Sequence, residues 1–267
     1  PTVHAVTEQG KVNLYWNNKA ESSTDVVTGY ADFEGYKIYK SLDDGATWGK
    51  PDDMVYDTDG IFVGWRPYAQ FDLSAEDDSL HCAYSNDYNC GPKESRGHSI
   101  KGQDPYFPWF SLGDDTGFDM IQLSEPYVAD GDTFHYVFED TEVIDGLEYT
   151  YSIVAYDMGV EPPYRTVYES LGNGQFNAVI DTNYSNPDQW ASPEGYANIE
   201  NSKGTTVLDR NFVQVYPGVQ PQANLDNVGI VPNPYIVRSG YKESEYLRQI
   251  RFTNLAGQCT ISIFTIT

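Results

Sequence analysis

The stretch 33–48 constrains the fold most, because a strand pattern is followed directly by a turn pattern. Residues 36–41 are mainly aromatic and β-branched, and Gly35 interrupts the pattern just before them, which predicts a β-strand. Residues 43–45 (Asp-Asp-Gly) tolerate positive φ and predict a reversal, after which Thr47-Trp48 would begin the return strand. A strand this aromatic needs a facing sheet, so the stretch predicts a layered β fold.

Similar short runs recur along the chain. In residues 147–157 the side chains at every second position share one face, which makes this the strongest strand pattern. Aromatic residues make up 15% of the chain, with 22 Tyr, 23 Gly and 15 Pro, a composition that favours short strands joined by frequent turns. We therefore expect an all-β protein. Further strands are expected at 2–8, 11–17, 133–139, 148–157, 211–216, 228–237, 247–252 and 259–264.

Three segments divide the chain. Residues 1–216 are expected to form one β domain with a long insertion at about 50–130, and residues 160–200 are turn-rich. Residues 217–224 contain Pro, Gly and Gln and resemble an interdomain linker. Residues 225–267 are expected to start a second, smaller β-sandwich-type domain that is incomplete in this chain. Cys259 lies in an apolar alternating run there, and we expect it to be a buried thiol.

The first segment resembles a fibronectin type III module of the immunoglobulin-like β-sandwich class. The resemblance rests on the strand with Trp16, on residues 35–39 (Gly-Tyr-Lys-Ile-Tyr) and on the run from Val143 through Tyr149. In that family a tyrosine six positions after a large apolar residue closes the corner between two sheets with a hydroxyl-to-backbone hydrogen bond. The resemblance covers residues 1–56 and 131–216, and it implies that Tyr149 plays this part.

The C-terminal segment resembles the sandwich that precedes the sorting domain of type IX-secreted bacterial surface proteins in Bacteroidetes-like lineages. The matching stretches are 231–235 (Val-Pro-Asn-Pro-Tyr), 248–255 and 259–264, with a junction-like stretch at 201–206. This resemblance implies a secreted, surface-attached bacterial protein.

The chain is strongly acidic, with 40 Asp and Glu against 16 Lys and Arg and a net charge of -24. A phosphate backbone or an anionic membrane surface would be repelled, so nucleic-acid binding is not expected. No stretch is long and apolar enough to predict a membrane span. Two interpretations of the acidity stay open: a well-solvated surface, or loop carboxylates that bind divalent cations.

Calcium is the cofactor that these loop carboxylates predict. Asp57 and Asp59 stand where a calcium loop would begin, although the distant glutamate of an EF-hand is missing. Asp114 and Asp115 are further candidate oxygen ligands. The alternative for each of them is a solvated turn aspartate.

Cys82 and Cys90 lie in one polar loop and predict a disulfide, which would staple a segment with little apolar content. Paired zinc thiolates are usually separated by only about two to four residues, so the spacing argues against zinc. A disulfide implies an oxidising compartment.

The expected insertion contains an aromatic group formed by Trp65, Tyr68, Phe71 and the run 106–110, and its candidates for binding are Trp65, Tyr106, Trp109 and Phe110. Aromatic faces stack on sugar rings, so these side chains are candidates for a polysaccharide-binding surface. The alternative is a satellite core beneath a long loop.

Catalytic motifs give little support to an enzyme. The sequence has neither a G-x-S-x-G elbow nor a phosphate-binding glycine loop, and its four histidines are scattered. Residues 41–48 match the Asp-box pattern S-x-D-x-G-x-T-W, which we interpret as a structural hairpin. Carboxylate pairs for glycoside hydrolysis cannot be selected from sequence, which leaves a glycosidase as a third hypothesis.

The sequence thus favours a non-catalytic secreted or cell-surface protein with a structural or adhesive role, which could self-assemble into an extracellular layer or filament. Its expected partners are other protein subunits or components of the cell envelope. The alternative is the accessory carbohydrate-binding region of a secreted hydrolase, with polysaccharide as the partner.

Overall fold

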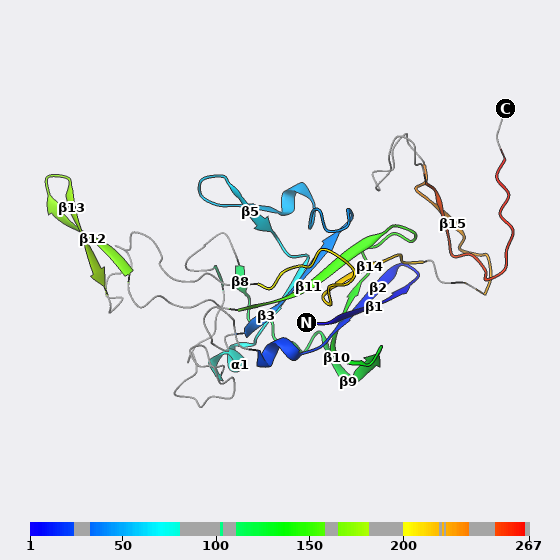
Figure 1. The fold of residues 1–267 in the computed structure, drawn as a ribbon, viewed down its shortest axis with the longest axis horizontal. Coiled ribbons are helices and arrows are strands. Elements are labelled where there is room, and N and C mark those ends of the chain that lie inside the picture. The colour runs from blue at the N-terminus through cyan, green and yellow to red at the C-terminus, as the bar shows by residue number, and fades with distance from the viewer. Residues whose placement is uncertain are drawn as a thin grey trace.

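The computed structural model describes residues 1–23, 33–80, 102–103, 111–157, 165–181, 200–218, 221, 223–234 and 249–264. Antiparallel β-structure dominates these ranges (Figure 1). The expected β class is therefore confirmed, and α1 (Ala75–Leu80) is the only α-helix in the described ranges.

The strands are β1 (Val3–Glu8), β2 (Lys11–Trp16), β3 (Phe33–Ser41), β4 (Met54–Tyr56), β5 (Phe62–Trp65), β6 (Ala69–Asp72), β7 (Gly102–Gln103), β8 (Ser111–Gly113), β9 (Gln122–Ala129), β10 (Asp132–Asp140), β11 (Tyr149–Asp157), β12 (Arg165–Gly172), β13 (Gln175–Asp181), β14 (Phe212–Val215), β15 (Gly229–Val231) and β16 (Arg251–Thr253). Two 3-10 turns, η1 (Lys19–Ser22) and η2 (Pro51–Asp53), complete the elements.

Two four-stranded antiparallel sheets form the main body. The first has the order β1-β2-β10-β9 and the second the order β14-β11-β3-β6. Strands β3 and β11 form the centre of the second sheet, with Ile38 opposite Ile153. The strands expected in 2–8, 11–17, 36–41, 133–139, 148–157 and 211–216 are all present.

The two sheets share one buried hydrophobic core. Trp16 and Tyr136 come from the first sheet, and Tyr36, Tyr151 and Ile153 come from the second. The indole of Trp16 lies 5.8 Å from the ring of Tyr36 in an edge arrangement. Each fully buried aromatic side chain removes a large apolar area from water, so these rings dominate the energetics of the core.

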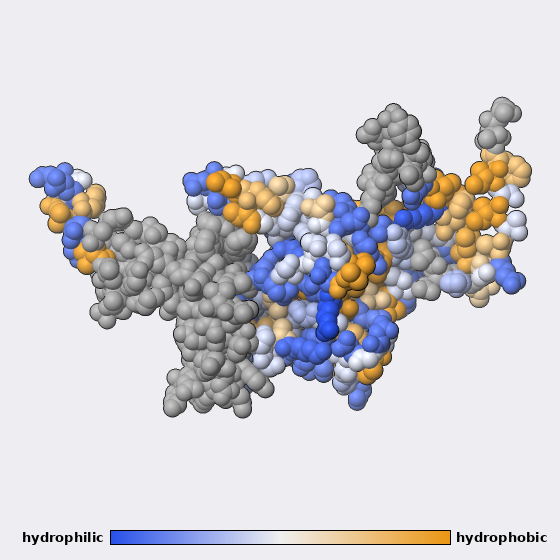
Figure 2. Space-filling view, in the orientation of Figure 1, coloured by the Kyte–Doolittle hydropathy of each residue, from blue (hydrophilic) through white to orange (hydrophobic). Residues whose placement is uncertain are grey.

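The segment expected to be an insertion contributes to both main sheets. Strand β6 forms one edge of the second sheet by pairing with β3, and β9 forms one edge of the first by pairing with β10. Strands β4 and β5 form a separate hairpin that carries exposed Ile61 and Phe62 at its tip. Figure 2 shows apolar colour on this hairpin.

The return strand expected at Thr47-Trp48 is wrong, because a turn occupies this stretch. Asp43 accepts hydrogen bonds from the Thr47 N–H at 2.8 Å, the Thr47 hydroxyl at 2.8 Å and the Ser41 hydroxyl at 2.8 Å. Gly45 takes a positive φ of 81°, which glycine adopts without steric cost. These bonds hold the chain in the turn and delay the next strand until Met54.

Residues 165–181 form a hairpin that the turn-rich pattern of 160–200 did not predict. Its strands β12 and β13 pair around the turn at Asn173, where Gly172 and Gly174 also have positive φ. The hairpin carries exposed Leu171 and Phe176 near this turn.

The C-terminal segment contacts the main body at the turn that contains Asp145. Asp145 accepts hydrogen bonds from the Gly10 N–H at 2.7 Å and from the Asn254 side-chain amide at 3.1 Å. Strands β15 and β16 pair with each other here, so a strand overlaps each of the expected ranges 228–237 and 247–252. The division of the chain at residues 217–224 stays a prediction.

Two expectations for residues 259–264 are wrong. They have no strand pairing within the described part of the chain, and Cys259 is an exposed free thiol rather than a buried one. Apolar side chains of this segment, including Ile263 and Phe264, are exposed, and Figure 2 shows them as an apolar region next to β15. Apolar and polar residues do alternate here as in a strand, but no other segment of the described residues pairs with this one or covers its apolar face.

Candidate binding pockets

The Asp-box turn positions Trp48 against the second sheet. The buried indole packs edge-on against Tyr39 at 6.1 Å and Phe212 at 6.1 Å. Trp65, at the end of β5, packs against the same buried cluster, so the β4–β5 hairpin contacts the second sheet through it. The turn is therefore structural in itself, and it also builds one wall of a pocket.

Lys40, which lines that pocket, forms an ion pair with the buried carboxylate of Asp140. The Lys40 ammonium lies 2.7 Å from Oδ2 of Asp140, whose side chain is fully buried. The hydroxyls of Tyr68 and Tyr151 also donate to this carboxylate, at 2.8 and 2.6 Å. Because every charge in this group has a partner, burial of the pair is compatible with a stable fold.

These contacts shift the pKa of the groups involved. Burial acts to raise the pKa of Asp140, but the hydrogen bonds from Lys40, Tyr151 and Tyr68 outweigh it and hold the pKa below its ordinary value. Burial, followed by the hydrogen bond to Asp140, raises the pKa of Tyr68 and of Tyr151. The carboxylate is therefore charged, and both phenols are neutral donors, at neutral pH.

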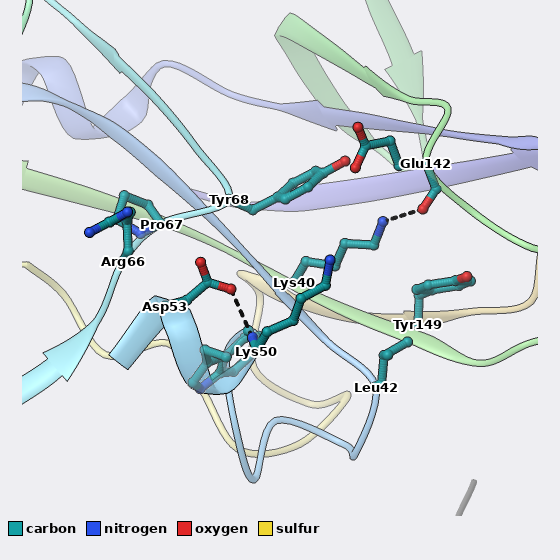
Figure 3. Close-up of a pocket in the computed structure, with 11 residues that line it drawn as sticks. Lys40, Leu42, Lys50, Asp53, Arg66, Pro67, Tyr68, Glu142 and Tyr149 are labelled. Atoms are coloured by element: carbon teal, nitrogen blue, oxygen red, sulfur yellow. Dashed lines mark hydrogen bonds between the residues drawn. The ribbon is translucent and has the colours of Figure 1, made fainter. Parts of the chain in front are cut away.

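The first of two adjoining pockets, the Lys50 pocket, has a volume of about 470 Å³. Figure 3 shows Lys50 extending beside Lys40 into the space between Tyr68 and Tyr149. Arg66 lies at the other end, beyond Pro67. The charged and aromatic lining residues are Lys40, Trp48, Lys50, Asp53, Arg66, Tyr68, Glu142 and Tyr149.

The second pocket, the Trp65 pocket, has a volume of about 690 Å³ and shares Arg66, Pro67 and Tyr68 with the first. Both volumes fall in the range of about 300–1,000 Å³ that is usual for ligand sites. Its other charged and aromatic lining residues are Lys37, Tyr39, Tyr56, Trp65 and Asp114. We call the two together the paired pockets.

A second ion-pair group supports the Trp65 pocket from β3. Lys37 lies 3.5 Å from Glu200, and its ammonium lies 4.2 Å from the ring centre of Tyr156. Lys203 also contacts Glu200, to which the Tyr39 hydroxyl donates at 2.8 Å. Burial acts to raise the pKa of Glu200, but the charges of Lys37 and Lys203 outweigh it and lower that pKa.

Two basic side chains of the paired pockets have no acidic partner of this kind. Lys50 and Arg66 are exposed, and neither makes an ion pair with another of the described residues. Sequence reasoning missed both, as well as Lys40, and it singled out Tyr149 for the sheet corner rather than for a pocket. The basic residues of the pockets lie on separate elements, so no sequence motif marks them as a site. The only signal for them in the sequence is that basic residues are scarce in this chain.

The aromatic residue predicted for binding that can be placed is Trp65. It is half-buried on the wall of the Trp65 pocket and packs edge-on against Phe62 at 5.4 Å, which in turn contacts Tyr56 at 6.1 Å. Tyr106, Trp109 and Phe110 lie outside the described residues, and so do Cys82 and Cys90 of the predicted disulfide.

The predicted calcium ligands take part in hydrogen bonds within the protein, at a turn for Asp57 and Asp59 and beside Asp72 for Asp114 and Asp115. Asp57 accepts hydrogen bonds from the N–H groups of Asp59 and Ile61, both at 2.9 Å, and so caps the turn between β4 and β5. The N–H groups of Asp114 and Asp115 donate to the buried carboxylate of Asp72, at 3.0 and 2.7 Å. Among the described residues, no group of three or more His, Cys, Asp or Glu is arranged to hold a metal ion. Calcium binding stays a prediction.

Comparison with known proteins finds no matching family model, no matching curated protein and no matching solved structure. Within the described ranges, no helix has the length and apolar character required to cross a membrane. Function is therefore inferred from the site itself.

Proposed function

We propose that this chain is a non-catalytic, structural or adhesive module of a secreted or cell-surface bacterial protein. The observation that carries the proposal is the paired pockets, which exposed Lys50 and Arg66 and half-buried Trp65 line from the turn before η2 and from the end of the β4–β5 hairpin. Basic and aromatic side chains that converge on a preformed concave surface are typical of a recognition site. The module would bind other subunits, components of the cell envelope or polysaccharide, and it could assemble into an extracellular layer or filament.

The proposed frame for this module is a fibronectin III-like sandwich. Three observations support it: the two sheet orders, the core common to both sheets and the contact made by Tyr149. The Ile144 N–H donates to the Tyr149 hydroxyl at 2.8 Å, and Val143 packs against the core. A hydroxyl-to-backbone bond of this kind is the corner that the family uses to join its sheets.

The proposed location of the module is the bacterial cell surface, which it would reach by type IX secretion. It rests on the resemblance of residues 231–235, 248–255 and 259–264, and on the expectation that residues 225–267 start a second β-sandwich-type domain. The pair β15–β16 and its contact with Asp145 are compatible with this arrangement.

The alternative function is the carbohydrate-binding accessory region of a secreted hydrolase. The position of Trp65 favours it, because this ring and Tyr56 line one pocket of a size suited to a small ligand. Both hypotheses predict binding without turnover. They differ in whether the partner is an intact envelope or a polysaccharide that an attached enzyme degrades.

Cosedimentation of the purified chain with isolated bacterial envelopes and with insoluble polysaccharides tests the proposal, together with sedimentation velocity over a range of concentrations. We expect envelope binding or concentration-dependent assembly, and no release of reducing ends from any polysaccharide. A chain that stays monomeric and binds neither material contradicts an adhesive role. Release of reducing ends contradicts a non-catalytic one.

Thermal unfolding tests the predicted calcium and disulfide. A ligand that binds only the folded state stabilises it by about 2.7 kcal/mol at a hundred times its Kd, so calcium is expected to raise the Tm and EDTA to reverse the rise. Reductant added with EDTA is expected to lower the Tm further through loss of the Cys82–Cys90 bond. An unchanged Tm in either arm contradicts that part of the prediction.

A further inference from the structure

We propose that the paired pockets bind a saccharide that carries one carboxylate-bearing ring among neutral rings. The carboxylate lies against Lys50, and a neighbouring ring packs in the Trp65 pocket, which Arg66 borders. This inference rests on the proposed function as an extracellular binding module, and it names the ligand of that module.

The charges of the Lys50 pocket select one carboxylate. Lys40 already has the Asp140 carboxylate at 2.7 Å, whereas Lys50 has no ion-pair partner within the described part of the chain. Figure 3 shows the Lys50 side chain beside that of Lys40, between Tyr68 and Tyr149, and both lysines line the pocket. An ammonium there suits a carboxylate, and the Arg66 guanidinium offers further hydrogen-bond donors at the other end of the pocket.

The acidic residues of the same pocket argue against an anionic peptide or a polyanion. Asp53 and Glu142 line the pocket together with the bases, so the site offers hydrogen-bond acceptors as well as donors. Sugar hydroxyls donate to such acceptors, whereas further carboxylates or phosphates would be repelled by them. The chain's net charge of -24 opposes a polyanion over longer distances as well.

The aromatic side chains of the second pocket provide the apolar part of the site. Tyr56, Trp65 and Tyr68 line it, and the edge-on contacts through Phe62 fix the first two rings in place. The apolar faces of sugar rings pack against such flat surfaces, while the tyrosine hydroxyls and Gln70 provide polar contacts. Pro67 and Arg66 border both pockets, so one short chain of rings can occupy both.

Titration calorimetry on the full chain tests the inference with two matched pairs of ligands. One pair is a xylo-oligosaccharide with a single methylglucuronic acid branch and its unbranched counterpart. The other is sialyllactose and lactose. In at least one pair, the acidic member is expected to bind at least about tenfold more tightly than the neutral one. A tenfold difference in affinity corresponds to the usual contribution of one charge-assisted hydrogen bond.

Three variants locate the binding. Lys50→Gln is expected to abolish the preference for the acidic member. Lys19→Gln removes an equal charge from an exposed lysine that is not among the lining residues, and it should preserve the preference. Tyr56→Ala should weaken both members of the pair alike, whereas Phe176→Ala, which removes an exposed ring on the β12–β13 hairpin, should weaken neither.

Several outcomes overturn the inference. These are no binding of any member at millimolar concentration, equal binding within both pairs, or a preference that survives Lys50→Gln. Tighter binding of a polygalacturonate fragment or of an oligoglutamate peptide also overturns it, and the peptide result would indicate an acidic protein partner. If envelope binding or assembly persists while every saccharide fails, only this inference is lost and the proposed function stands.

Discussion

Strand β11 (Tyr149–Asp157) and the segment 259–264 have the same kind of alternating sequence but opposite environments. Ile153 in β11 is completely buried between β3, β14 and the facing sheet, whereas Ile263 is 73% exposed. Alternation of apolar residues gives a segment the capacity to form a strand. Neighbouring strands decide whether this capacity is used, because only they can satisfy the backbone and cover the apolar face.

The most severe way to disrupt the packed region is to remove Asp140, which lies beneath the Lys50 pocket. Asp140→Ala leaves the Lys40 ammonium without its buried partner, and removal of one member of such a pair costs roughly 3–5 kcal/mol. Denaturant unfolding measures the loss. Asp59→Ala, at an exposed turn position, is the matched control, and an equal loss in both variants would contradict the role of the ion pair.

The pH dependence of the unfolding free energy is a second test of the ion pair between Lys40 and Asp140. Since the folded-state pKa of Asp140 lies below its ordinary value, its stabilisation is present above the unfolded pKa of about 4 and is lost as the pH falls through the folded pKa. Glu21 acts in the opposite direction, because burial raises its pKa. We therefore compare wild type with Asp140→Asn between about pH 5 and pH 2. The difference in unfolding free energy should shrink toward acid, and a constant difference would show that titration of Asp140 is not involved.

Paired substitutions of isoleucine test the comparison directly. Ile153→Ala removes a fully buried side chain from the core, which costs about 2–5 kcal/mol. Ile263→Ala changes an exposed side chain and should alter the unfolding free energy by no more than about 0.5 kcal/mol. Equal losses from chemical denaturation would mean that the C-terminal segment is packed in solution.

The Asp-box turn gives the smallest expected effect. Asp43→Ala removes the acceptor for the Thr47 N–H and for two hydroxyls, at a cost of about 1–2 kcal/mol. The fluorescence of Trp48 should shift toward that of a solvated indole as the turn loosens. Trp48→Phe, with and without Asp43→Ala, identifies the source of the signal. An Asp43→Ala variant with unchanged spectrum and stability would contradict the proposed role of the carboxylate.

Much of the main body could be predicted from the sequence because its signals are local. The period of two, the turn residues and the aromatic composition located β1, β2, β3, β10, β11 and β14. The same signals failed at Thr47-Trp48, where side-chain bonds to Asp43 override the strand propensity of threonine and tryptophan. They also missed the β12–β13 hairpin, because the turn signal at 172–174 was taken as part of an irregular stretch.

Only the aromatic part of the candidate site could be predicted. Trp65 and Tyr68 were identified from their residue type, but Lys50 and Arg66 come to line one pocket only through the turn after β3 and the hairpin that follows it. A pocket depends on which side chains converge in space, and sequence spacing does not encode that for residues on separate elements.

The sequence by itself determined the β class, most strands of the two main sheets and the acidic surface, because each depends on local pattern or on composition. Tertiary structure alone decided which strands became neighbours, and therefore which alternating runs were buried. It also decided the partner of each charge: Lys40 lies against Asp140, while Lys50 faces an open pocket. Contacts between distant segments carry this information, since burial and charge pairing depend on distances in space.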